Sequence, residues 1–361
     1  MFDHRHYVPI LKGREGEYGA LQMLHERHAL TPLLEVPPIA WDYEEERPAK
    51  TIDRHLEKVP QKIQRSWGPD RLLYLDLLWI SESERMDDGR HPMKYVLDGG
   101  RNLGIVLIPV VGLLKGDEYL NACREAEQQD HRGVCVRVQR EDFVDFSDLA
   151  EPIAHVLDAI KVAPSQVDFI FDLRALTPTE REVSTAHAID LINRIPMLGS
   201  WRSFALAATS FPQNLMGLPP SDSSRLPRTE WTLWREIWKN RGSIRRMPTF
   251  ADYAISHPEP AEVDPRVMRP SASVRYTCDD AWLILKARNL KDHGYEQFHE
   301  VCGDLVNADQ YAGRSFSWGD TYIADCAARR VGTGNLTTWR KVGTSHHLVF
   351  VPRQLASVFG S

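Results

Sequence analysis

The chain has 361 residues, 42% hydrophobic and 26% charged, which is typical of a folded globular protein and excludes a disordered one. A formal net charge of −6 disfavours nonspecific nucleic-acid binding, which usually needs a strongly basic protein. The longest apolar run, residues 104–114, is too short to span a membrane, and the start of the chain lacks a signal-peptide pattern. Because the five cysteines are scattered and form no CxxC pair, we expect reduced thiols and a cytoplasmic protein.

Short apolar segments recur along the chain, and most are apolar on both faces. This pattern is typical of parallel strands that are buried on both sides of a sheet. Charged segments with helical character separate them. The predicted strands are 7–12, 31–36, 72–80, 104–112, 133–138, 167–173, 202–210 and 248–256, and the predicted helices are 17–29, 51–67, 117–130, 148–161 and 178–195.

Eight strands that alternate with helices predict a (β/α)8 barrel of the TIM type over residues 1–257. The alternative is an open doubly wound sheet, although no glycine-rich fingerprint follows the first strand. Because such a barrel takes about 250 residues, we expect residues 258–361 to form a smaller C-terminal α+β module or lid.

A tryptophan-rich insertion is predicted at about 211–247, between the last two barrel strands. Its helical stretch, 228–241, places Trp231, Trp234 and Trp238 on one helix face. Either this face packs on the barrel wall, or it binds a partner protein.

The C-terminal module opens with a proline-rich linker and then a predicted hairpin around Cys278, Asp279 and Asp280. A helix-like segment at 294–307, a turn at 332–339 and a last helix-like stretch near 346–359 follow. We interpret His346 and His347 as packing or surface residues, because adjacent histidines lack the spacing of a helical metal pair.

Barrel active sites lie at the C-terminal ends of the strands, and several predicted strands are charged there. Glu35, Asp76 and Asp172 stand inside apolar strands, where a charge is costly unless it is paired or functional. They are candidate catalytic groups, and also candidate ligands for a divalent cation such as magnesium. The candidate ligand-binding residues at the barrel mouth are Lys12, Arg137, Arg174, Ser210, Asp252 and Tyr253.

Three interpretations of this cluster stay open. It is a metal-dependent hydrolase site for a phosphorylated or nucleotide substrate, a site that binds an anionic ligand without turnover, or an ion-pair network that only fills the barrel. In the enzyme interpretation, Trp318 and Asp320 of the C-terminal module belong to a lid that covers the mouth and contacts the substrate.

Several short motifs together resemble the beta-protein family, which is named for a bacteriophage protein. They are YVPILKGREGEYGAL, PLLEVPP, YLDL, IPVVGL, SVRYT, SFSWGD, GNLTTW and HHL. The resemblance implies a protein of phages and of bacterial mobile or defence regions, and hence a defence or counter-defence role, but it brings no catalytic residues. The positions within the matching motifs are Lys12, Glu35, Asp76, Trp318, Asp320, Asn335 and His347. A noncatalytic protein that recognises a phage or host protein is the alternative function.

Overall fold

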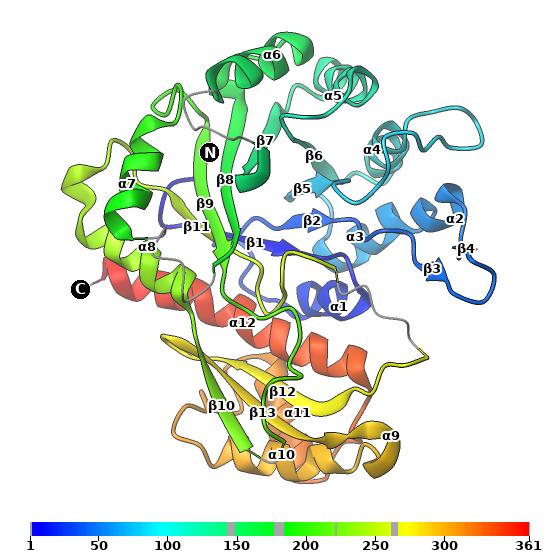
Figure 1. Ribbon diagram of the computed structural model, residues 1–361, viewed down its shortest axis with the longest axis vertical. Coiled ribbons are helices and arrows are strands. Elements are labelled where there is room, and N and C mark those ends of the chain that lie inside the picture. Colours follow the sequence, from blue (N-terminus) through cyan, green and yellow to red (C-terminus); the bar gives the residue numbers. More distant parts are fainter. Residues whose placement is uncertain (1, 143–148, 177–183, 221, 261–265, 361) are drawn as a thin grey trace.

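The computed structural model describes residues 2–142, 149–176, 184–220, 222–260 and 266–360. Its centre is a closed parallel barrel with the strand order β1-β11-β9-β8-β7-β6-β5-β2 (Figure 1). This closure confirms the predicted barrel and excludes the open sheet. The barrel strands are β1 (Tyr7–Leu11), β2 (Leu33–Glu35), β5 (Leu72–Asp76), β6 (Val106–Val111), β7 (Val134–Gln139), β8 (Val167–Ala175), β9 (Ser203–Thr209) and β11 (Thr249–Asp252).

Every segment predicted as a helix overlaps a described helix, although 51–67 is divided into two helices. Helices surround the barrel. They are α1 (Glu15–Met23), α2 (Ile52–Leu56), α3 (Val59–Trp67), α4 (Pro92–Asn102), α5 (Asp117–Asp130), α6 (Ala150–Ile160), α7 (Thr185–Arg194), α8 (Thr229–Lys239) and α12 (Leu336–Phe359). The sequence did not predict α4, whose two adjacent glycines weaken helix propensity. Its start is fixed by Pro92 in the first turn and by the His91 ring, which accepts a hydrogen bond from the amide of Met93. The predicted helix 178–195 falls partly on 177–183, which lie outside the described residues.

The middle of the barrel interior is apolar, and a layer of charged side chains lies above it towards the mouth. Successive inward positions on a strand are two residues apart. The inward apolar residues are Val8, Ile10, Leu33, Tyr74, Ile108, Val110, Cys135, Ile170, Ala205, Ala207, Ala251 and Tyr253. Two residues after Leu33, Tyr74, Cys135 and Ile170 stand Glu35, Asp76, Arg137 and Asp172. The period of the strands therefore places all four charges in one layer near the mouth.

A smaller antiparallel sheet has the order β10-β13-β12. Strands β12 (Ser271–Thr277) and β13 (Ala281–Asn289) are the predicted hairpin, and β10 (Asp222–Pro227) pairs with β13. Helices α9 (Leu290–His293), α10 (Gln297–Val306) and α11 (Trp318–Ala327) complete this module. Its separate core includes Tyr276, Phe298, Cys302 and Ile323. The domain boundary at 257 stays a prediction, and β10 joins the module sheet from the barrel side of that boundary.

A small hairpin lies between β2 and α2, and its strands β3 (Trp41–Asp42) and β4 (Arg47–Pro48) have two residues each. Among the described residues, none of the helices has both the length and the apolar character that crossing a bilayer requires.

The long helix α12 runs between the barrel and the small sheet (Figure 1). Its Leu348 and Leu355 join the barrel-wall core, whereas Val342 joins the core of the module. Gly16 of α1 permits close packing, because a Cβ there would lie 2.8 Å from the carbonyl oxygen of Thr337.

The predicted turn at 332–339 was wrong over its second half, because α12 already begins at Leu336. The Asn335 side chain accepts a hydrogen bond from the amide of Thr338 at 3.0 Å, and the Thr338 hydroxyl accepts one from the amide of Asn335. This reciprocal capping starts the helix four residues before the end of the predicted turn.

The tryptophan face of α8 packs on the barrel wall. Trp231 and Trp234 are each 1% exposed, and the Trp234 indole donates a hydrogen bond to Pro248. Trp238 is half-buried against the same core. The packing interpretation is therefore the one that the geometry supports.

Candidate functional site

Arg137 stands at the centre of the mouth cluster and is only 2% exposed. Its Nη1 donates to Glu35 Oε1 at 2.8 Å and to Asp76 Oδ2 at 2.7 Å. Its Nη2 donates to Asp172 Oδ2 and to the Tyr253 hydroxyl, both at 2.6 Å. The structure thus brings together the three predicted acids, Arg137 and Tyr253 from five different strand ends.

The charges in this cluster are nearly balanced, since three carboxylates face the two cations Arg137 and Lys12. Burial acts to raise the pKa of Glu35, but Lys12 and Arg137 outweigh it and lower that pKa to about 2. Burial raises the pKa of Asp76, because Arg137 offsets only part of the desolvation. Burial opposes the charge of Arg137 too, yet its anionic neighbours raise its pKa well above the usual value. An ion-paired layer that fills the barrel explains these values.

The three acids do not enclose an open position for a cation, because the Arg137 guanidinium lies between them. Within the described ranges, no group of three or more His, Cys, Asp or Glu side chains is arranged to hold a metal ion. A metal bound by these acids would have to displace Arg137. The geometry therefore favours the ion-pair and binding interpretations over the metal interpretation.

Above this layer, Lys12 and Arg174 form the rim of the mouth. Lys12 Nζ contacts Glu35 and the Pro258 carbonyl oxygen, and it lies 5.6 Å from the centre of the Trp79 ring. Arg174 pairs with Glu259, and its guanidinium lies 6.0 Å from the same ring centre. Both cations are less than 10% exposed. The segment after β11 therefore covers them.

Arg174 has a strained backbone with φ of +57°. It lies where the β8–β9 register shifts, between Asp172 and Ala175, and its amide donates to Asp172 Oδ1 at 2.9 Å. A bulge of this kind redirects a side chain at a strand end, and residues with strained φ concentrate at functional sites. The bulge at β8 explains how Arg174 reaches the rim.

Gln139 is a further polar residue of the mouth. It follows Arg137 by two residues on β7, so it faces the same way, and it is 9% exposed. Its Nε2 is buried and has no hydrogen-bond partner among the described residues. Buried donors are nearly always paired, so this amide is available to a ligand acceptor.

Two predicted mouth residues belong to other networks. The Ser210 hydroxyl donates to Glu230 Oε2 at 2.8 Å. Asp252 accepts from the Tyr7 hydroxyl at 2.5 Å, and His347 Nε2 lies 3.0 Å from its Oδ2. Neither the Ser210 hydroxyl nor the Asp252 carboxylate takes part in the Arg137 cluster.

The predicted lid residues lie in the module. Asp320 accepts from the Tyr276 hydroxyl at 2.7 Å and lies 2.9 Å from His346 Nδ1. Trp318 stacks with Lys341, whose Nζ is 3.9 Å from the ring centre. The rim cations are instead contacted by Pro258 and Glu259, and Arg174 also lies 3.5 Å from Glu141.

Sequence reasoning missed Trp79, Gln139 and Glu259. The two-residue spacing from Arg137 was a usable signal for Gln139. Trp79 and Glu259 lie outside the barrel strands, and strand periodicity gives no information about loop residues.

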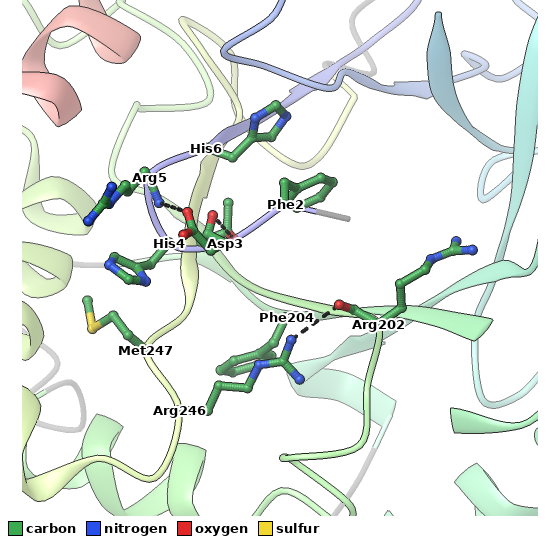
Figure 2. A pocket seen from close by; sticks show the side chains of 10 residues that line it. Phe2, Asp3, His4, Arg5, His6, Arg202, Phe204, Arg246 and Met247 are labelled. Atoms are coloured by element: carbon green, nitrogen blue, oxygen red, sulfur yellow. Dashed lines mark hydrogen bonds between the residues drawn. The ribbon is translucent and has the colours of Figure 1, made fainter. Parts of the chain in front are cut away.

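A cavity of about 620 Å³ lies at the opposite end of the barrel (Figure 2). Residues 2–6 form one wall, and Arg202, Phe204 and Arg246 line the rest together with Met247 and Thr249. Two of its arginines are already bonded, because Arg202 pairs with Asp168 at 2.6 Å and Arg246 donates to the Trp201 carbonyl oxygen at 2.7 Å. No predicted site residue lines this cavity, in keeping with the usual structural role of this barrel end.

A protein-family model described as "Beta protein" matches residues 7–353. The chain belongs to the Beta protein family. The match spans both the barrel and the module and confirms the resemblance drawn from the sequence motifs. No curated protein matches the chain.

Solved structures that share similarity with this Beta protein family member include tryptophan synthase alpha-subunits from Pyrococcus furiosus. A mutant form is 14% identical, with a TM-score of 0.37, over 70% of this chain and 88% of that one. Alanine racemase from Clostridium difficile 630, in complex with cycloserine, is 10% identical with a TM-score of 0.35, over 76% and 59%. Scores this low carry no argument about function.

Proposed function

We propose that the barrel mouth binds a small anionic ligand, such as a nucleotide or another phosphoester, and that the protein acts in conflict between phage and host. The observation that carries the binding proposal is the pair of rim cations, Lys12 and Arg174, which flank one Trp79 ring. Both meet oxygen acceptors of the same segment, the Pro258 carbonyl and the Glu259 carboxylate.

The acceptors of that segment are replaceable by a ligand. The Glu259 side chain is 46% exposed, so it is not locked in place by packing. A phosphate or carboxylate offers oxygen atoms to a guanidinium in the same geometry as Glu259 does. Gln139 then supplies a neutral donor to the same ligand.

Below the rim, the Arg137 layer gives this site a rigid floor. Its groups are mutually hydrogen-bonded and at most 3% exposed. Rigid support of this kind fixes the positions of the residues that touch a ligand. Hydrolysis assisted by a divalent cation would need an additional binding position, and the binding proposal does not depend on it.

The conflict role rests on the family alone. Membership is established by the match over residues 7–353, and the association with phages and with bacterial mobile or defence regions is what the motif resemblance implies. The alternative is a noncatalytic protein that binds a phage or host protein through the tryptophan-rich helix or the C-terminal module. Its tryptophan surface is reduced, because Trp231 and Trp234 are buried and Trp238 is half-buried.

Thermal unfolding with and without inorganic phosphate, ATP and Mg²⁺ tests the binding proposal. An anion at about 100 times its dissociation constant should stabilise the wild type by about 2.7 kcal/mol. We expect Arg174→Gln to lose this stabilisation and the surface control Glu45→Gln to keep it. Equal stabilisation of the wild type and of Arg174→Gln, or none with any anion, would overturn the proposal.

A further inference from the structure

Three arginines gather around one glutamate between the barrel and the module. Arg14 precedes α1, Arg275 lies on β12, and Arg340 lies in the second turn of α12. Glu17 Oε2 accepts a hydrogen bond from the amide of Arg14 at 3.1 Å, and Glu17 Oε1 lies 3.9 Å from Arg340 Nη1. The fold thus brings these charges together from three distant parts of the chain.

The segment after β11 contacts two of these arginines. Arg340 Nη1 donates to the Ser256 hydroxyl at 3.2 Å. Arg275 Nη1 donates to the carbonyl oxygen of Ile255, the preceding residue, at 3.1 Å. The guanidinium of Arg275 also lies 5.2 Å from the centre of the Phe211 ring. These contacts attach Arg275 and Arg340 to two adjacent residues of this segment.

The cluster has an excess of positive charge. Glu17 is its one carboxylate in the described part of the chain, and it is 1% exposed. Arg275 forms no ion pair with any described carboxylate, and the closest approach of Glu17 to Arg340 is long for an ion pair. Of the three guanidinium groups, Glu17 therefore stands near that of Arg340 alone, while the positive charges of Arg14 and Arg340 act on Arg275.

This excess is costly in free energy. Burial lowers the pKa of Arg275 to about 9, with further contributions from the positive charges of Arg340 and Arg14. Burial also lowers the pKa of Arg340, and Arg14 acts in the same direction while Glu17 opposes it. Like charges removed from water destabilise a fold unless a counter-charge is bound.

We propose that Arg14, Arg275 and Arg340 form a second anion site, separate from the mouth, that takes a phosphoryl group. Guanidinium groups present several donors in a fixed plane and match phosphate oxygens, so three of them suit a group with two negative charges. The Ser256 hydroxyl lies beside them as a further polar partner. None of these four residues belongs to the mouth cluster.

The site has a defined place relative to the mouth. Arg14 follows the rim residue Lys12 by two positions, and Ser256 precedes Pro258 by two. The same two segments, after β1 and after β11, therefore carry residues of both sites. An anion bound to Arg14 and Arg275 would also connect the barrel to the small sheet.

Isothermal titration with pyrophosphate tests this inference, with sodium chloride at matched ionic strength as the control titrant. We expect Arg275→Gln and Arg340→Gln each to weaken pyrophosphate binding at least about tenfold, in line with the loss of a charge-assisted hydrogen bond. Arg340→Lys keeps the charge and should retain part of the affinity. The exposed control Arg288→Gln should bind as the wild type does.

A structural role for the three arginines gives a different result. If they only hold the module in place, Arg275→Gln lowers the melting temperature and pyrophosphate changes neither protein. If they form an anion site, Arg275→Gln is at least as stable as the wild type without anions, because one repelling charge is gone. Pyrophosphate affinity that is unchanged in Arg275→Gln and Arg340→Gln would overturn the inference.

The same titration separates this site from the mouth. Loss of binding in Arg174→Gln but not in Arg275→Gln would support the proposed function and reject the second site. The reverse pattern would support the second site and reject the mouth proposal. Absence of binding in the wild type would reject both.

Discussion

Two clusters of charge near the barrel mouth, one buried and one partly exposed, differ in how they are neutralised. Arg137 and Lys12 together face three carboxylates, and Arg137 also donates to the Tyr253 hydroxyl, so each cation of this cluster has an anionic partner within hydrogen-bond distance. In the second cluster, only Arg340 lies within 4 Å of a carboxylate, that of Glu17, and the charges of Arg14, Arg275 and Arg340 act on one another. The first cluster is complete without a ligand and behaves as part of the core, whereas the second is incomplete and is suited to binding. Charge balance, rather than burial alone, separates a structural cluster from a candidate site.

The largest expected effect comes from removing the cation at the centre of the Arg137 cluster. Arg137→Gln leaves Glu35, Asp76 and Asp172 buried without their shared cation. Because removing one partner leaves uncompensated buried charge, we expect a loss of about 3–5 kcal/mol in the free energy of unfolding. Urea denaturation at pH 7 measures it. A loss below about 1 kcal/mol would mean that the acids are neutral in the wild type.

Acid titration sharpens the same comparison. The pKa of Glu35 is lowered from 4.5 to about 2 in the folded protein. Its contribution to stability is therefore fully present above about pH 4.5 and is lost as the pH falls towards 2, with a size of about 3 kcal/mol. Denaturation curves from pH 6 to pH 2 should show a flatter acid limb for Glu35→Gln. Identical limbs would contradict the lowered pKa.

A smaller effect is expected at Gln139, whose side-chain amide nitrogen has no hydrogen-bond partner among the described residues. Gln139→Leu removes a buried donor that has no described partner, so stability should stay the same or rise by up to about 1 kcal/mol. Phosphate affinity should fall. Gln166→Leu is the comparison, because its amide donates to Glu127 at 3.1 Å and its loss should destabilise. A destabilised Gln139→Leu would show that the amide already has a structural role.

The smallest effect is expected where charge is exposed. Glu45 and Arg47 are 3.7 Å apart, and their side chains are 63% and 70% exposed. Solvent screens such a pair, so Glu45→Gln should change the free energy of unfolding by less than about 0.5 kcal/mol. A larger change in the free energy of unfolding, measured by urea denaturation, would show that burial does not decide how much a charged residue contributes to stability.

The sequence predicts the Arg137 cluster much better than the cluster of Arg14, Arg275 and Arg340. Each barrel strand was found from its apolar run, and the two-residue period then places Glu35, Asp76 and Asp172 in one layer. Arg14, Arg275 and Arg340 meet only because α12 packs on α1 and beside β12, and no local pattern records that packing. The pairing of β10 with β13 was missed for the same reason, since it joins segments about sixty residues apart.

The contacts that close the barrel join segments that are synthesised at very different times. Strand β1 pairs with β2 on one side and with β11 on the other, and α1 packs against α12. The ribosome makes β1 and α1 first, and it makes β11 and α12 only after most of the chain has emerged. Until then, one edge of β1 stays unpaired and one face of α1 stays uncovered, and such surfaces favour aggregation. The nascent chain therefore exposes an unpaired strand edge and an uncovered helix face for most of the time that its translation takes.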